Sequence, residues 1–305
     1  MKNLAVIIPA FNSADTIVET LESLQRQSDL SAVCAVYLAD DASTDGTVAA
    51  AQAVWRSVVP FVVLRSEINQ GERSTVNRAV ARLPSGVEWF LILHADDIAK
   101  PEWVDVLAKE TAVAPHDVIS LTASYDVLDE AGRITPGENF GIERKVLVEG
   151  NTESIRSTLC RGCWFKVSSC AIRVEAFRSL GGFRCDMPQL GDWDFVLRAL
   201  EAGWVIEYLP LCLSVYRQHP GSVSSKSFRE HRDVTEALWV LDRFSRYLPG
   251  RDLLRRHLFY LKSLMRRSAR SILMGDGKRL YRAVSLSFGV AASFVRLEFR
   301  RLNSE

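Results

Sequence analysis

Two adjacent carboxylates, Asp96 and Asp97, directly follow an apolar run at 89–93. The run lacks alternation, which predicts a strand buried on both faces. Adjacent carboxylates repel each other, and their usual partner in proteins is a hard divalent cation. Mg2+ or Mn2+ bound to one or two carboxylates completes its coordination shell with phosphate oxygens, so the pair indicates a ligand that carries a diphosphate. The alternative is a helix cap, because Asp ahead of Pro101 also stabilises a helix start.

A second polar cluster, 40–47, follows the apolar run at 33–39. The carboxylates of Asp40 and Asp41 accept hydrogen bonds from N–H and O–H donors, so they could read a base and a ribose. From Ser43 to Thr47 the favoured interpretation is a capping loop ahead of the next helix.

The elements that must position these residues alternate between strand-like and helical patterns. Apolar runs at 4–8, 33–39, 61–64 and 89–93 are separated by segments with helical spacing. Such β-α repeats predict an α/β fold with a largely parallel sheet covered on both faces. In these sheets ligands bind at the carboxyl ends of the strands, which is where the polar clusters fall. From about Phe228 onward the pattern is helical only.

Six motifs follow one another in a set order between residues 4 and 225. They are VIIPAFN at 6–12, DDASTDGT at 40–47, the Asn69-Gln70-Gly71 turn with Asn77, LHADD at 93–97, GGF at 181–183 with GDWDFVLR at 191–198, and YRQHPGS at 216–222. Together they resemble the family 2 glycosyltransferases of GT-A fold. The resemblance implies a Rossmann-like, mostly parallel central sheet flanked by helices, followed here by a C-terminal helical extension.

The resemblance further implies inverting transfer of a sugar from a nucleotide diphosphate sugar, with UDP favoured, to a hydroxyl of a glycan or lipid-linked glycan. By position, Asp192 would be the general base that deprotonates the acceptor. Asp97 and His219 would hold Mg2+ or Mn2+, which stabilises the diphosphate leaving group. The positions implied to bind the substrates are Pro9, Phe11, Asp40, Asp41, Asn69, Gly71, Asn77 and Asp96.

Two further positions stay open between binding and packing. Trp193 would stack on an acceptor sugar or pack within an amphipathic helix. Arg217 would pair with a phosphate or with a surface carboxylate.

Three positions depart from the family pattern. The family often has Asp where this chain has His94, and Glu often precedes the base where this chain has Gly191. Arg usually precedes the Asn of the turn motif, and here that position is Val76, for which Arg73 or Arg78 could substitute.

Composition and charge divide the 305-residue chain into two parts. With 48% apolar and 25% charged residues it is a globular protein, and we expect a catalytic domain at 1–225 and a basic helical region at 226–305. The first 250 residues have a net charge of −8, whereas residues 251–305 carry 13 Lys/Arg against 4 Asp/Glu. The overall charge of +1 argues against a nucleic-acid partner.

The pattern of the basic region is compatible with three different partners. Amphipathic basic helices lie in anionic membrane interfaces, but the same pattern suits helices that pack on a domain, and apolar stripes also serve a homodimer. The six cysteines indicate free thiols in a reducing cytoplasm. The sequence predicts neither a signal peptide nor a spanning helix, so we expect a cytoplasmic protein that the tail could bring to the inner face of the membrane.

Other functions compete with a metal-assisted glycosyltransferase. One is a nucleotide-sugar-binding protein that has lost catalysis, in which His94 and Gly191 would be symptoms of the loss. A Rossmann oxidoreductase or methyltransferase is disfavoured because no G-x-G-x-x-G follows the first strand. A membrane-surface scaffold acting through the tail alone would leave the six motifs unexplained.

Overall fold

The computed structural model describes residues 2–137, 143–165 and 167–303, and these divide into two compact units. The first unit comprises residues up to Asn151 together with Trp164–His219. The second comprises Thr152–Cys163 and residues from Pro220 onward. The sequence had suggested a single division after residue 225, whereas these units divide at 219 and place 152–163 with the C-terminal helices.

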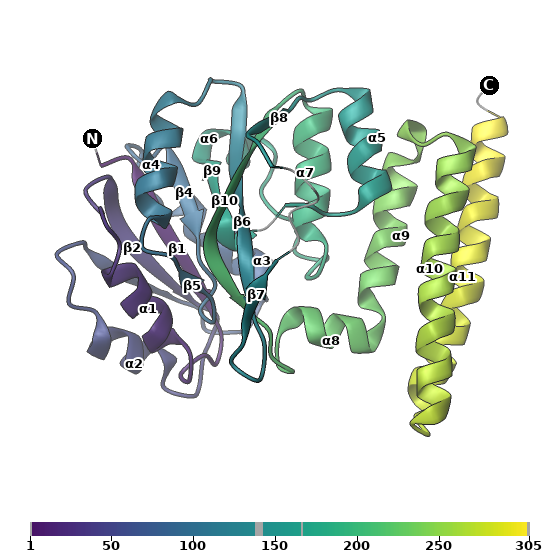
Figure 1. Cartoon of the computed structure of the whole chain (residues 1–305), viewed down its shortest axis with the longest axis horizontal. Helices are drawn as coiled ribbons and strands as arrows, with labels where there is room; N and C mark the ends of the chain where they lie inside the picture. Colours follow the sequence, from purple (N-terminus) through teal and green to yellow (C-terminus); the bar gives the residue numbers. More distant parts are fainter. Residues whose placement is uncertain (1, 138–142, 166, 304–305) are drawn as a thin grey trace. The chain divides into compact units, whose positions relative to one another are not determined.

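The first unit is built on one mixed sheet with the strand order β3-β2-β1-β4-β9-β6-β10-β5, with β7 paired to β6 and β8 to β10 (Figure 1). The strands are β1 (Leu4–Ala10), β2 (Val33–Asp40), β3 (Phe61–Arg65), β4 (Trp89–Ile92), β5 (Ile98–Ala99), β6 (Val118–Leu128), β7 (Ile134–Pro136), β8 (Val146–Val148), β9 (Cys170–Arg173) and β10 (Val205–Arg217).

The four N-terminal strands of the sheet run parallel, as the β-α repeats predict. β1 pairs in parallel with β2 on one side and with β4 on the other, and β3 continues from β2. β9 then pairs antiparallel with both β4 and β6, while β6 and β10 are again parallel. The carboxyl ends of β1, β2 and β4 therefore meet at one edge of the sheet.

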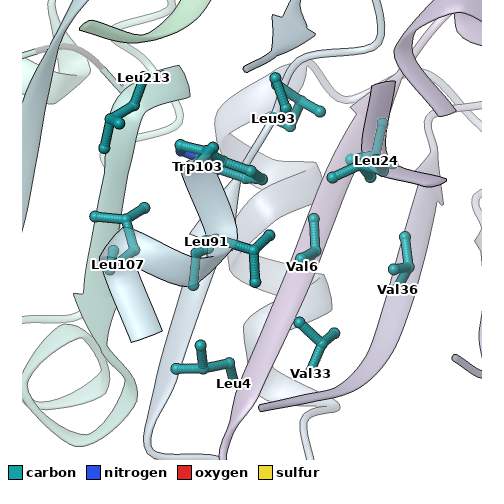
Figure 2. Packing of buried hydrophobic residues seen from close by; sticks show 14 of the residues in the cluster. Leu4, Val6, Leu24, Val33, Val36, Leu91, Leu93, Trp103, Leu107 and Leu213 are labelled. Carbon is teal, nitrogen blue, oxygen red and sulfur yellow. The ribbon is translucent and has the colours of Figure 1, made fainter. Parts of the chain in front are cut away.

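One face of this sheet is covered by α1 (Ile17–Gln25), α2 (Thr47–Val54) and α4 (Trp103–Val113). Figure 2 shows strand residues such as Val6, Val36 and Leu91 packed with Leu24 of α1 and with Trp103 of α4. These side chains are fully buried and form the hydrophobic core of the unit. Alternate strand residues face the opposite side, because successive side chains of a strand point in opposite directions.

The opposite face is packed by aromatic rings beneath α3 (Glu72–Ala81), α6 (Val174–Ser179) and α7 (Gly191–Glu201). Phe90 of β4 meets Phe177 of α6 edge to face, with ring centroids 5.0 Å apart. Phe177 in turn contacts Phe183 and Phe195 at 5.0 and 5.4 Å. Edge-to-face pairs favour defined ring orientations, so this cluster fixes the start of α7 and the turn before it.

The second unit consists of helices in the described residues. They are α5 (Thr152–Arg161), α8 (Val223–Glu230), α9 (Arg232–Phe244), the short η2 (Ser245–Tyr247), α10 (Gly250–Leu273) and α11 (Gly277–Leu302). The long helices α10 and α11 lie side by side (Figure 1). The pair formed by the buried Arg267 and the half-buried Asp233, with N···O of 2.6 Å, joins α10 to α9.

Several local features differ from the sequence pattern. β10 continues through Pro210, which the sequence would place at a strand end, because irregularities between Leu209 and Ser214 absorb the break. The loop-rich stretch 132–149 contains the short strands β7 and β8, and its residues 138–142 lie outside the described residues. Helix α5 was not predicted.

Truncation of Leu91 tests the core of the first unit. Leu91 is fully buried on β4, so Leu91→Ala should lower the free energy of unfolding by about 2–5 kcal/mol through lost burial and a residual cavity. The measurement is the urea midpoint followed by tryptophan fluorescence. Val58→Ala, at a side chain 98% exposed, is the control and should leave the midpoint unchanged; equal effects of the two substitutions would contradict this core.

Candidate active site at the carboxyl edge of the sheet

The loops that follow β1 and β2 are joined by hydrogen bonds at the carboxyl edge of the sheet. The side chain of Asn12, which has a φ of 49°, accepts from the N–H of Thr44, and the N–H of Ser13 donates to the Thr47 hydroxyl. Asp45 accepts from the N–H of Ala14 and from the N–H of Thr47. These bonds hold the two loops together, and Asp45 accepts from the first N–H of α2, whose N-cap residue Gly46 offers no side-chain cap.

Asp41 fixes the turn that precedes α3. Its carboxylate accepts from the N–H of Gln70 at 3.1 Å and from that of Gly71 at 2.7 Å, and Arg78 lies 3.9 Å away. Gly71 has a φ of +86°, a backbone conformation that glycine adopts without strain. Asp41 is almost fully buried, so these donors compensate a carboxylate removed from water.

The two carboxylates after β4 have different surroundings. Asp97 is fully buried, with Oδ1 accepting from the Arg217 N–H at 3.0 Å and Oδ2 lying 3.4 Å from His94 Nδ1. Asp96 is 27% exposed, and its Oδ2 lies 2.9 Å from Nε2 of His219, which is 37% exposed. Of the pair, Asp96 is the carboxylate that an added ligand could reach.

Arg217, the last residue of β10, and His219, two residues beyond it, contact the Asp96–Asp97 pair. The guanidinium of Arg217 donates to the Asp96 carbonyl oxygen at 2.9 Å and pairs with Glu19. The sequence left a phosphate or a surface carboxylate as the partner of Arg217, and in this structure the partner is the carboxylate of Glu19.

His94 lies between three polar groups. Its Nε2 is 3.1 Å from Glu72 Oε1, and its Nδ1 is 2.5 Å from the Ser168 hydroxyl as well as near Asp97. Burial alone would lower the pKa of His94, but the charges and hydrogen bonds of Glu72 and Asp97 outweigh it and raise the pKa to about 10. His94 is therefore an imidazolium at neutral pH, and it balances part of the negative charge at this edge.

Asp192 lies in the first turn of α7 and faces Arg73. Its Oδ1 accepts from the N–H of Trp193 at 2.8 Å, and its Oδ2 is 3.8 Å from an Nη of Arg73. The same guanidinium is 3.2 Å from Glu72 Oε1 and lies over the Phe183 ring, 5.1 Å from its centroid. The contacts run without a break from Asp97 through His94, Glu72 and Arg73 to Asp192.

Asn77 holds the GGF turn. Its Nδ2 donates to the Phe183 carbonyl at 2.8 Å, and its Oδ1 accepts from the Phe183 N–H at 2.9 Å. A Cβ on Gly182 would lie 2.5 Å from Asn77 Oδ1, and the φ of Gly182 is +72°, so both space and backbone require glycine. On the other side of the turn, Arg198 bonds the Gly182 carbonyl and pairs with Asp194.

The remaining predicted positions differ in exposure. Phe11 is 47% exposed beyond the end of β1, whereas Pro9 is buried within that strand. Trp193 is 1% exposed, a position that fits packing better than stacking on a sugar. Asn69 accepts from the Gly71 N–H and so shapes the turn that Asp41 holds.

Sequence reasoning missed Glu72 and Ser168, which contact His94, and it named Arg73 only as a substitute for a missing Arg. Glu72 and Arg73 follow the turn motif directly, and their acidic-basic order was the available signal. Ser168 had no signal, because its contact joins positions 74 residues apart.

The described residues contain no cluster of three or more His, Cys, Asp or Glu side chains suited to a metal ion. Asp96 and His219 nevertheless supply an oxygen and an imidazole nitrogen 2.9 Å apart. Two protein ligands fit Mg2+ or Mn2+ where a diphosphate contributes further oxygens.

Residues 5–181 match the model of glycosyl transferase family 2, and the chain belongs to this family. It is 26% identical over 235 residues to an uncharacterized glycosyltransferase of Haemophilus influenzae, a match covering 76% of this chain and 74% of that protein. It is 25% identical to the succinoglycan biosynthesis protein ExoA of Rhizobium meliloti, over 66% of this chain and 59% of the relative. The protein is a glycosyltransferase.

Solved structures with the same fold include S. aureus TarS. TarS residues 1–349 in complex with UDP-GlcNAc superpose with a TM-score of 0.61 at 20% identity, covering 83% of this chain and 66% of that one. The complex of TarS 1–349 with UDP gives a TM-score of 0.57 at 17% identity, covering 94% of this chain and 91% of that one. The fold is GT-A-like, as the motifs implied.

A charge change at position 94 tests the network around His94. His94→Asp would place a third carboxylate beside Glu72 and Asp97, so it should lower the free energy of unfolding by about 2 kcal/mol more than the neutral His94→Asn. Glu72→Gln in the His94→Asp background should recover part of the loss. Urea denaturation at pH 7 measures all four proteins; equal stability of His94→Asp and His94→Asn would show that the charges at this edge are not coupled.

Proposed function

We propose that this glycosyltransferase moves a sugar from a UDP-sugar to a hydroxyl of a glycan or lipid-linked glycan, with inversion and with Asp192 as general base. The observation that carries the proposal is the continuous set of contacts from the Asp96–His219 pair to Asp192. These residues are far apart in the sequence, and the fold gathers them at the edge where parallel sheets bind ligands. The UDP and UDP-GlcNAc complexes of TarS support the choice of donor.

The donor site is proposed at the ends of β1, β2 and β4. Phe11 offers an exposed ring for a base, and Asp40 and Asp41 lie at the end of β2. Asp41 already holds the Asn69–Gly71 turn, so its proposed role is to place that turn beside the base as well as to contact the base itself. Asp97, which is buried, would then support Arg217 and His94 from below.

Asp96 and His219 are the proposed cation ligands, because both are accessible and Asp97 is not. A bound Mg2+ or Mn2+ would neutralise the charge that develops on the diphosphate leaving group. Asp192 would take the proton from the acceptor hydroxyl. The hydroxyl oxygen would bond to the anomeric carbon as the bond from that carbon to the diphosphate breaks. A single displacement of this kind inverts the anomeric centre.

Polysaccharide assembly is the proposed setting, supported by the likeness to a succinoglycan biosynthesis protein. The alternative is a nucleotide-sugar-binding protein without catalysis. The contacts of His94 and Arg73 favour the enzyme, because the residue that departs from the family pattern at 94 and the Arg that could substitute for the one missing at Val76 both have partners within the site.

Asp192→Asn separates these two functions. The substitution removes the proton acceptor, so UDP release from UDP-glucose, UDP-galactose or UDP-N-acetylglucosamine, with water as acceptor and Mn2+ present, should fall by about 10²–10⁴-fold. UDP with Mn2+ should still raise the melting temperature of the variant, because ligand binding stabilises the native state. The control is Asp186→Asn, an exposed carboxylate near the same helix. A wild-type protein that binds UDP yet releases none from any donor would favour the binding protein.

We further propose that α10 and α11 lie on an anionic membrane surface at the cytoplasmic face. Each helix has an apolar stripe opposite its buried face, Leu254, Leu258, Met265 and Ile272 on α10 and Tyr281, Val284, Phe288, Val295 and Phe299 on α11, all at least 42% exposed. Exposed basic residues flank the stripes, among them Arg255, Lys262 and Arg266 on α10 and Arg282, Arg296 and Arg300 on α11. Such helices bind interfaces through apolar burial and attraction to anionic lipids.

One of these helices changes an expectation from the sequence. Among the described residues, α11 is long and apolar enough to cross a membrane by length and composition, with a mean hydropathy of 1.2 over its best 18-residue window. Ala283, Val290 and Leu297 on α11 are buried, so one side of the helix is already packed against protein. An interfacial position uses the opposite side and keeps this packing.

Flotation with liposomes tests the surface. The intact protein should float with vesicles that contain anionic lipid, less with neutral vesicles, and less again at high salt, because the basic flanks are screened. Phe288→Glu with Phe299→Glu should abolish flotation, whereas Val58→Glu with Val113→Glu, two exposed apolar residues of the first unit, should not. Absence of flotation together with a dimer in solution would assign the stripes to a second copy of the chain.

A further inference from the structure

We propose that Arg73 is a positioning residue for Asp192 and that Gly191 is the residue that makes room for it. The proposal rests on the proposed function, in which Asp192 is the base. It assigns Arg73 no contact with the reacting atoms, and it gives a joint explanation for two departures from the family pattern.

Arg73 is built into the interior. It is the second residue of α3, its side chain is 6% exposed, and its guanidinium lies over the Phe183 ring. Glu72 holds one Nη at 3.2 Å, and the other lies 3.8 Å from Asp192 Oδ2. An arginine buried in this way loses little further freedom when it pairs, so it can hold a carboxylate in one orientation.

The absence of a side chain at 191 allows this arrangement. A Cβ on Gly191 would lie 3.2 Å from Arg73 Nε and 3.5 Å from its Cδ, with the Arg184 carbonyl at 3.4 Å on the other side. The 3.2 Å contact requires the Arg73 side chain to move by a few tenths of an ångström, and a Glu would add four further heavy atoms beyond its Cβ. Gly191 therefore does not mark a lost acceptor contact but accommodates a cation beside the base.

The position of Asp192 follows from two different partners. Oδ1 accepts from the backbone N–H of Trp193, whereas Oδ2 faces the guanidinium. Asn77 fixes Phe183, on which Arg73 rests, and the aromatic cluster fixes Phe183 from below. The orientation of the Asp192 carboxylate is thereby tied to α3, and catalysis is sensitive to displacements of about 1 Å in a reacting group.

The contacts form one continuous series. Asp97, His94, Glu72, Arg73 and Asp192 follow one another, each within 3.8 Å of the next. An Asp at 94 would replace the imidazole by a second carboxylate beside Glu72. His94 and Gly191 are thus parts of one arrangement that links the donor end of the site to the base.

Substitution of Arg73 gives the direct test. Arg73→Gln should lower kcat for UDP release from the accepted UDP-sugar by about 10–100-fold, with the donor KM and the UDP-induced shift in melting temperature unchanged. Arg73→Lys should restore part of the loss, because it returns the charge without the fork geometry. Arg82→Gln, at the exposed end of the same helix, is the matched control.

Gly191→Ala provides an independent route to the same contact. Its Cβ should displace the guanidinium and lower kcat in the wild-type background, but it should have little further effect in Arg73→Gln, because the group it displaces is absent. Additive losses in the double variant, or a loss of UDP binding in Arg73→Gln, would overturn the proposal. Full activity of Asp192→Asn would instead overturn the proposed function, so the two failures are distinguishable.

Discussion

The site depends on the compensation of carboxylates that the fold gathers at one edge of the sheet. Parallel strands bring Asp40, Asp41, Asp96 and Asp97 together, and three of them are nearly or fully buried. A buried charge is tolerated only when it is paired or hydrogen-bonded. Asp41 accepts hydrogen bonds from two backbone N–H groups, and Asp40 forms an ion pair with Arg65. Asp97 accepts from the backbone N–H of Arg217 and lies beside the His94 ring. Asp96, with His219, is left facing solvent.

The same compensation determines which residues remain available for substrates. A carboxylate committed to the fold, such as Asp97 or Asp194, shapes the site through its partners, whereas Asp96 and Asp192 are partly accessible. Asp96 and Asp97 are chemically identical neighbours in the sequence, but the fold buries one and leaves the other partly exposed. This difference is the physical basis for proposing Asp96, in place of Asp97, as the carboxylate ligand of the cation.

The side of the site proposed to take the acceptor is organised around α3 and the GGF turn. Asn77 binds both backbone groups of Phe183, Arg198 binds the Gly182 carbonyl, and the aromatic cluster supports the turn from the sheet. The Asn77 bonds join motifs 106 residues apart, so the turn motif and the GGF motif stabilise each other in the folded chain. The family's motifs thus act on each other as well as on the ligands they are expected to bind.

The sequence by itself determined the α/β class, the parallel N-terminal strands and the family, because hydrophobic periodicity and local motifs are written in consecutive residues. It also located the polar loops at strand ends. Only the tertiary structure decided which carboxylate of the Asp96–Asp97 pair is exposed, that Asn77 binds the GGF turn, and that His94 and Arg73 connect to Asp192. Those outcomes depend on burial and on contacts across 22 to 123 residues, which no local pattern encodes.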